Sequence, residues 1–257
     1  MDLLHIVLLL GAGLIGGTLS ALIGGAAIIT YPALLAVGLN PVLATAANMV
    51  ALTPGNFVAA LYDRGQLPPL DRSFVWLVLA SVLGALAGAA LLLVTPVRVF
   101  AALVPLLLGF ATVLFACSSR LSAWLRARAA ARARPAATHW GSSIAALVPV
   151  SIYGGYFGGG VGVLLLAVLS IGTDGDYRSA NVTKNLVTSL NCVVVSLYFI
   201  AEDAVSWGPA LVMMAGALVG AVLGARLAQV LPNEIARALV VVVGALLTGA
   251  FAWRYWF

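Results

Sequence analysis

The sequence predicts an all-α polytopic membrane protein, and its composition and apolar runs carry that prediction. Of its 257 residues, 63% are hydrophobic and only 8% are charged, whereas a soluble domain carries about 25% charged residues. The mean hydropathy is +1.13. Several apolar runs reach the roughly 20 residues that a helix needs to span a bilayer. These runs lack the period-two alternation of a membrane β-barrel, so helical spans are expected.

The basic residues predict the orientation of the chain in a membrane rather than binding to nucleic acid. The net charge is +5, but five arginines lie between Arg120 and Arg134, in one expected loop between helices. Membrane proteins concentrate basic residues in their cytoplasmic loops. We therefore expect a multi-pass protein of the cell (inner) membrane, with this segment inside and no nucleic-acid partner.

The expected helices follow from apolar runs and cap residues. A glycine-broken apolar stretch covers 3–38, and Asn40-Pro41 then supplies the cap and first turn of a segment over 41–62. Later spans are expected over 73–94, from the Thr95-Pro96 cap to about Cys117, and, after a second glycine-broken stretch over 141–178, in the rest of the second half. The chain thus divides into a first membrane repeat (1–118), a basic cytoplasmic linker (119–139) and a second membrane repeat (140–257).

An internal duplication relates the two membrane repeats. Gly16-Gly17 matches Gly154-Gly155 at a shift of 138 residues, and from Ala44 onward the shift is 136. The shift of 136 superposes a helix-packing pair and a helix-capping proline on their counterparts, namely Gly84 and Gly88 on Gly220 and Gly224, and Pro96 on Pro232. One constant shift for features of different kinds indicates two homologous halves.

The placement of charges favours inverted halves over parallel ones. If the basic linker and the 63–72 loop lie inside, the loop at Glu202-Asp203 belongs outside and Arg178 belongs inside. Both hold when the stretch 141–178 enters and leaves on the cytoplasmic side as a hairpin, which makes the halves inverted repeats. Counting each broken element once, we expect about eight spans. The alternative treats each broken stretch as one kinked span and gives parallel halves.

Two glycine clusters are too dense for plain helices. They comprise Gly24 and Gly25 in the first half, and Gly158, Gly159, Gly160 and Gly162 in the second. Each glycine inside a helix costs up to about 1 kcal/mol relative to alanine, so the clusters predict helix breaks. A broken helix presents backbone N–H groups and a positive dipole end, which suit an anion. The alternative is close helix packing, because glycine is frequent in membrane helices.

A polar helix face follows each broken stretch. In the second half, Asn181, Lys184 and Asn185 share one face at spacings of three and four, and the matched face of the first half carries Thr45 and Asn48. Lys184 is the only lysine of the chain. Ionisable residues inside a membrane usually serve function, although a lysine near a helix end also reaches the surface by snorkelling. We expect these five residues and the glycine clusters to form one substrate site.

The acidic residues indicate the charge of the substrate. All eight Asp and Glu residues map to loops or helix ends, so no carboxylate is expected in mid-membrane. Cation carriers typically rely on buried carboxylates, which favours an anionic substrate here. We find no nucleophile–base pair, P-loop, cofactor motif or metal-ligand cluster, so the sequence predicts neither an enzyme nor a cofactor or metal site. The coupling ion (H+ or Na+) and a homodimer are left open.

Two stretches resemble a known family of permeases. GGYFGGGVGVLLL followed by ANVTKN looks like the second-half signature of the sulfite exporter TauE/SafE family, and LIGGAAIITYPALLAVGL followed by ATAAN looks like its first half. The resemblance covers nearly the whole chain. It implies a membrane permease for sulfur-containing oxoanions or organosulfonates, usually with eight spans. Ala26 stands where the family tends to have a third glycine, so we expect the second-half break to dominate anion binding.

Together these features predict an exporter of sulfite or a small organosulfonate that works by alternating access between the two repeats. Lys184 would supply charge, and hydrogen-bond donors would come from Asn181, Asn185, Asn48 and Thr45. Two alternatives stay open. One is a membrane scaffold or assembly factor with the basic linker as its docking surface, and the other is a transporter of another small anion.

Overall fold

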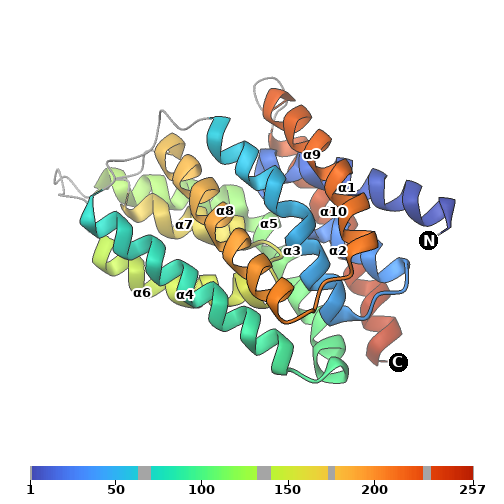
Figure 1. Ribbon diagram of the computed structural model, residues 1–257. Coiled ribbons are helices and arrows are strands. Elements are labelled where there is room, and N and C mark those ends of the chain that lie inside the picture. Colours follow the sequence, from blue (N-terminus) through green and yellow to red (C-terminus); the bar gives the residue numbers. More distant parts are fainter. Residues whose placement is uncertain (1, 63–70, 132–139, 173–176, 228–232, 257) are drawn as a thin grey trace.

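The described residues fold into ten helices and no strand. The computed structural model describes residues 2–62, 71–131, 140–172, 177–227 and 233–256. The helices are α1 (Leu3–Ile23), α2 (Ala27–Ala36), α3 (Pro41–Tyr62), α4 (Arg72–Val94), α5 (Val97–Ala131), α6 (Trp140–Tyr156), α7 (Val161–Gly172), α8 (Tyr177–Ala201), α9 (Trp207–Leu227) and α10 (Asn233–Trp256). They form one bundle to which each half contributes five helices (Figure 1).

Six helices within the described ranges are long and apolar enough to cross a membrane, namely those in α1, α4, α5, α8, α9 and α10. α3 and the α6–α7 pair, the other two of the eight expected spans, are not among them. The outer surface carries large apolar side chains such as Val94 and Trp253, which are 76% and 75% exposed. Soluble monomers rarely expose large apolar patches, and contact with lipid accounts for this surface. The predicted all-helical architecture is confirmed.

Helix starts agree with their cap residues, and α5 extends as a helix beyond its expected span. The Leu43 N–H donates to the Asn40 side chain at 2.9 Å, and the Phe74 N–H donates to the Asp71 carboxylate at 2.7 Å. The candidate span in α5 covers Val97–Arg120, close to the expected end near Cys117, but the helix itself continues to Ala131. Alanine, arginine and leucine dominate that extension, and these residues favour helix. The expected boundary between the first repeat and the linker therefore lies inside a continuous helix; residues 132–139 lie outside the described residues.

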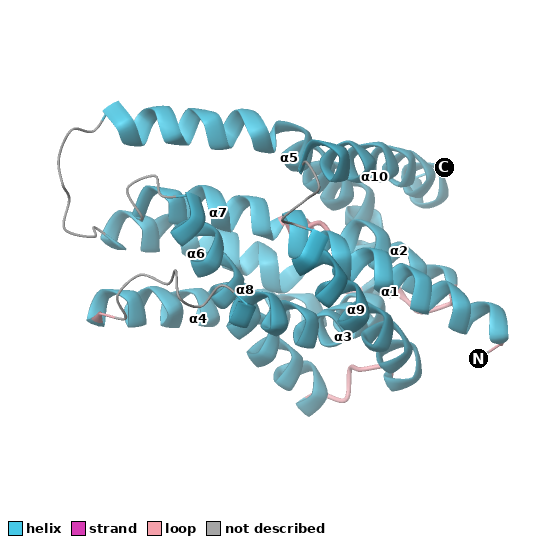
Figure 2. Cartoon of the chain, turned by 90° about the horizontal axis from the view of Figure 1, so that it is seen from above, coloured by secondary structure: helices cyan, strands magenta, loops and turns pink. Residues whose placement is uncertain are grey.

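Both glycine-broken stretches fold back as hairpins rather than continuing as kinked spans. α1 ends at Gly24, which has a φ of 80° and donates its N–H to the carbonyls of Leu19 and Ser20. α2 then turns back along α1 (Figure 1). In the second half Gly158 and Gly160 have φ values of 80° and 74°, and α7 returns beside α6 (Figure 2). Glycine adopts this left-handed backbone at no steric cost, which is why the breaks fall at these residues.

The first helix of each half packs against a helix of the other half. α1 packs along α9 of the second half, and α6 packs along α4 of the first half. A Cβ on Gly88 would collide with the backbone of Ile152, and a Cβ on Gly220 would collide with the backbone of Leu14. Small residues spaced four apart allow this approach. The paired glycines are therefore packing faces, each of which serves the opposite half.

α3 and α8, which are matched by the duplication, cross at the centre of the bundle. The hydroxyls of Thr53 and Ser196 lie 3.0 Å apart, and Asn56 Nδ2 lies 3.5 Å from Cys192 Sγ. Because the later residue on α3 meets the earlier residue on α8, the two helices run in opposite directions. Asn56 and Cys192 are separated by 136 residues, which is the shift of the duplication. Residues that the duplication matches therefore contact each other at this crossing.

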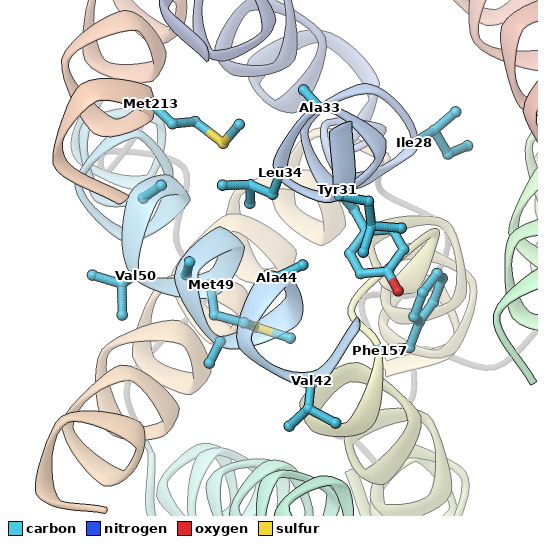
Figure 3. Close-up of a cluster of buried hydrophobic side chains, with 14 of the residues drawn as sticks. Ile28, Tyr31, Ala33, Leu34, Val42, Ala44, Met49, Val50, Phe157 and Met213 are labelled. Carbon is cyan, nitrogen blue, oxygen red and sulfur yellow. The ribbon is translucent and has the colours of Figure 1, made fainter. Parts of the chain in front are cut away.

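A buried apolar cluster connects this crossing to both hairpins (Figure 3). Tyr31 and Leu34 of α2 pack near Met49 of α3, and Met213 joins them from α9. The rings of Tyr31 and Phe157 meet edge to face with their centroids 5.5 Å apart. Phe157 belongs to the break between α6 and α7, so this contact packs one hairpin against the other.

Candidate functional site

The two helix breaks face one cavity at the centre of the bundle. Its volume is about 80 Å³, which at roughly 15 Å³ per water is room for a few waters or one small anion. Both halves supply its wall. The polar side chains that line it are Ser20, Asn48, Asn56, Lys184, Asn185, Thr188, Asn191 and Cys192.

The backbones of the two breaks touch beside this cavity. A Cβ on Gly162 would lie 3.4 Å from the Gly24 Cα and 3.9 Å from the Lys184 Cδ. Gly24 and Gly162 differ by 138 residues, the shift of the duplication in this region. Matched residues of the two halves therefore meet here as well. The absence of side chains here lets the halves meet and leaves room for the stem of Lys184.

Lys184 lies two turns into α8 and lines the cavity. It is 4% exposed, and its Nζ donates to Asn181 Oδ1 at 2.9 Å. An ammonium group has three donors, and no second acceptor lies within hydrogen-bond distance of this one among the described residues. The residues that line the cavity include no Asp and no Glu. Lys184 thus brings a positive charge to the cavity wall with a neutral amide as its partner.

Asn48 faces the same cavity from α3, at the position that the duplication matches with Lys184. It is 3% exposed, and its Oδ1 has no hydrogen-bond partner in the described structure. The hydroxyl of Thr188, which also lines the cavity, is buried and likewise without a partner there. Buried polar atoms are nearly always paired, so these two oxygens indicate a place where a ligand or water binds.

Three further polar side chains of the cavity wall are paired with one another. Ser20 donates to Asn56 Oδ1 at 2.7 Å, and Asn56 Nδ2 lies 3.5 Å from Cys192 Sγ. These bonds tie α1, α3 and α8 together.

A second network lies behind the wall, where α4, α6 and α8 meet. The hydroxyls of Ser81 and Ser151 lie 2.8 Å apart, and Asn191 Nδ2 donates to the Ser81 hydroxyl at 2.8 Å. The two serines are fully buried and Asn191 is 9% exposed. The network fixes the orientation of Asn191, the one member that lines the cavity.

α2 and α7 both begin at the cavity. Ala26 and Ala27 line it at the start of α2, and Val161 and Gly162 line it at the start of α7. The first N–H groups of a helix lack intrahelical acceptors and carry a positive partial charge. Each hairpin therefore presents the positive end of a short helix to the cavity.

The structure brings part of the predicted site together. The predicted residues that line the cavity are Gly24, Asn48, Gly158, Gly162, Lys184 and Asn185. Asn181 lies outside the lining and accepts the Lys184 hydrogen bond. The Thr45 hydroxyl donates to the Pro41 carbonyl of its own helix at 3.1 Å.

The other predicted glycines shape the breaks without lining the cavity. Gly25 packs against Phe115, Gly160 packs against Ala111, and the Gly159 carbonyl accepts a hydrogen bond from the Tyr153 hydroxyl at 2.6 Å.

Several hydroxyl groups of the site were not singled out in the sequence, namely those of Ser20, Ser81, Ser151 and Thr188. Serine and threonine in helices often bond to the carbonyl four residues earlier, so their presence in an apolar run carries little signal. The available signal was the pair of amides, Asn56 and Asn191, which lie deep inside apolar segments.

A family model described as sulfite exporter TauE/SafE matches residues 9–251. The chain belongs to the sulfite exporter TauE/SafE family. The match covers both halves and both hairpins of this TauE/SafE protein, so the resemblance noted in the sequence is confirmed.

Relatives of this TauE/SafE chain are named as membrane transporters. It is 26% identical over 260 residues to a probable membrane transporter protein of Haemophilus influenzae, covering 100% of this chain and 98% of the relative. It is 25% identical over 238 residues to the probable membrane transporter protein YfcA of Escherichia coli strain K12, covering 91% and 85%. It is 28% identical over 236 residues to the probable membrane transporter protein ORF9 of Sinorhizobium sp, covering 90% and 86%. No solved structure matches the chain. With six candidate spans, the family and these names support a multi-pass membrane transporter.

Proposed function

We propose that this chain exports a small sulfur-containing anion, sulfite or an organosulfonate, and that the anion binds in the central cavity. The observation that carries the proposal is Lys184, a buried cation on the wall of a cavity whose lining contains no carboxylate. Burying an unpaired charge costs several kcal/mol. A bound anion would offset that cost, and the positive ends of α2 and α7 would add to the attraction.

We further propose that the halves are inverted repeats and that access to the cavity alternates as one half rocks against the other. The antiparallel crossing of α3 and α8 supports this assignment. So does the contact between Gly24 and Gly162, because it joins matched residues of the two halves beside the cavity. A site where the two halves meet would be reachable from either side after a modest rotation of the halves.

Flux measurements in proteoliposomes test the proposal. The purified protein should move sulfite, and thiosulfate, sulfoacetate and taurine would define its range. We expect Lys184→Ala to abolish sulfite flux while the protein still inserts and elutes as a single species. The control is Arg98→Ala, which removes a positive charge from the exposed start of α5 and should leave flux unchanged. Sulfite flux at the parent rate in Lys184→Ala would refute the role of Lys184.

A scaffold function is the second candidate, and the length of α5 is the observation that favours it. Its 35 residues extend for about 52 Å at 1.5 Å per residue, whereas the hydrocarbon core is about 30 Å thick. The end beyond the core carries Arg126 and Arg128. Deleting 126–134 distinguishes the candidates, because a transporter should keep its flux and a docking protein should lose its function in cells.

A further inference from the structure

The charge of the cavity wall limits the charge of its ligand. Lys184 is the one ionised side chain among the residues that line the cavity, so the wall carries a single positive charge. A singly charged anion neutralises it. A doubly charged anion would leave a net negative charge in a buried cavity, which has a high desolvation cost.

The unpartnered oxygens of the wall limit the hydrogen-bonding character of the ligand. Asn48 Oδ1 is a buried acceptor without a partner among the described residues, and Asn48 lines the same cavity at the position that the duplication matches with Lys184. The Thr188 hydroxyl, also unpaired, is both a donor and an acceptor. A bare sulfonate group has acceptors only. It satisfies the Lys184 ammonium but leaves Asn48 Oδ1 without a donor.

We propose that the cavity selects monoanions that carry a hydrogen-bond donor in addition to the anionic oxygens on sulfur, and that Asn48 Oδ1 accepts the hydrogen bond from this donor. The inference rests on the proposed anion transport and names the substrate class for that site. Hydrogensulfite and hydroxyl-bearing sulfonates belong to the class. Dianions and plain alkylsulfonates do not.

Calorimetric titration of the purified full-length protein with three probes tests this inference. Isethionate is a monoanion with a hydroxyl donor, ethanesulfonate is a monoanion of similar size without one, and sulfoacetate is a dianion. We expect isethionate to bind about tenfold more tightly than ethanesulfonate, which is the worth of one satisfied buried acceptor, and sulfoacetate to bind most weakly. Asn48→Leu keeps the size of the side chain and removes the amide. In that variant the preference for isethionate should be lost, so that the two monoanions bind equally.

The outcomes separate this inference from the proposed function. Equal binding of isethionate and ethanesulfonate by the parent protein overturns the selection for a donor. Tight binding of sulfoacetate overturns the selection for monoanions. Both results leave the proposed anion transport standing. Loss of affinity for both monoanions in Asn48→Leu shows that the amide donates to the anion and overturns the assigned role. If no probe binds and none is transported, both proposals fail. Should Asn48→Leu not fold, Asn48→Ala provides the second variant, and a parent-like preference for isethionate in Asn48→Ala overturns the inference.

Discussion

The junction of α4, α6 and α8 and its counterpart at α9, α1 and α3 occupy matched places in the two halves but differ in chemistry. The first contains the hydrogen-bonded set Ser81, Ser151 and Asn191. The duplication matches these residues with Ala217, Gly13 and Gly55.

The counterpart junction packs by backbone contact. A Cβ on Gly13 would collide with the backbone of Met213, and a Cβ on Gly55 would lie 3.2 Å from the Ala221 side chain. The same scaffold therefore closes one junction with polar side chains and the other with small apolar ones. The polar junction includes Asn191 of α8, the helix that carries Lys184, so the polar side chains are distributed unequally between the two matched junctions.

Moving the lysine to the matched position of the first half is the strongest test of this asymmetry. We expect Lys184→Asn to lower sulfite flux about 100-fold or more, as removal of one partner of a buried charge pair does. Adding Asn48→Lys should recover part of that loss, because position 48 faces the same cavity. The measurement is sulfite flux at matched protein density in proteoliposomes. A folded double variant with no flux would instead tie the anion to the second half alone.

Replacing the glycines at the α4–α6 and α1–α9 interfaces with larger residues should have the next largest effect, on stability. Gly88→Val and Gly220→Val place a side chain against the backbones of Ile152 and Leu14. Each should lower the free energy of unfolding by about 3 kcal/mol or more, seen as a large drop in melting temperature in detergent. Gly249→Ala is the control, because a Cβ there meets nothing within 4 Å. A normal melting temperature for Gly88→Val would contradict the packing described.

Breaking the polar junction should have a smaller effect. Ser81→Ala leaves the Ser151 hydroxyl and the Asn191 amide without their partner, which should cost about 1–3 kcal/mol of stability. Ser170→Ala is the matched control, since among the described residues its hydroxyl bonds to the Leu166 carbonyl of its own helix alone, and it should change stability by less than about 1 kcal/mol. Thermal unfolding followed by intrinsic tryptophan fluorescence compares the two. Equal effects would show that the network adds nothing beyond local bonding.

The sequence predicts where the helices and their breaks lie better than it predicts which helices pack against each other. Cap residues locate the start of α3, and the glycine clusters locate both hairpins, because these signals are local. The paired glycines mark packing faces but do not reveal that α6 packs on the opposite half, since that partner is set by the whole bundle. The extension of α5 was missed because basic residues were taken as a loop signal, whereas arginine and alanine also favour helix.

The sequence could identify a residue of the candidate site only where a polar side chain stands in an apolar helix. Lys184 and Asn48 stand out as polar groups in apolar helices, and both line the cavity. Thr45 stands out equally, yet its hydroxyl is used within its own helix. Sequence pattern cannot separate these cases, because the difference lies in which acceptors the fold places within reach.

Asn48 and Lys184 are matched by the duplication and line one cavity. In an assembly of two identical half-length copies, each substitution would occur twice, so a lysine at one of these positions would also stand at the other. Two ammonium groups would then share that space and repel each other. Joining the copies in one chain removes this constraint, because each position mutates independently. A single lysine matched with an asparagine is therefore an arrangement that two identical copies could not encode.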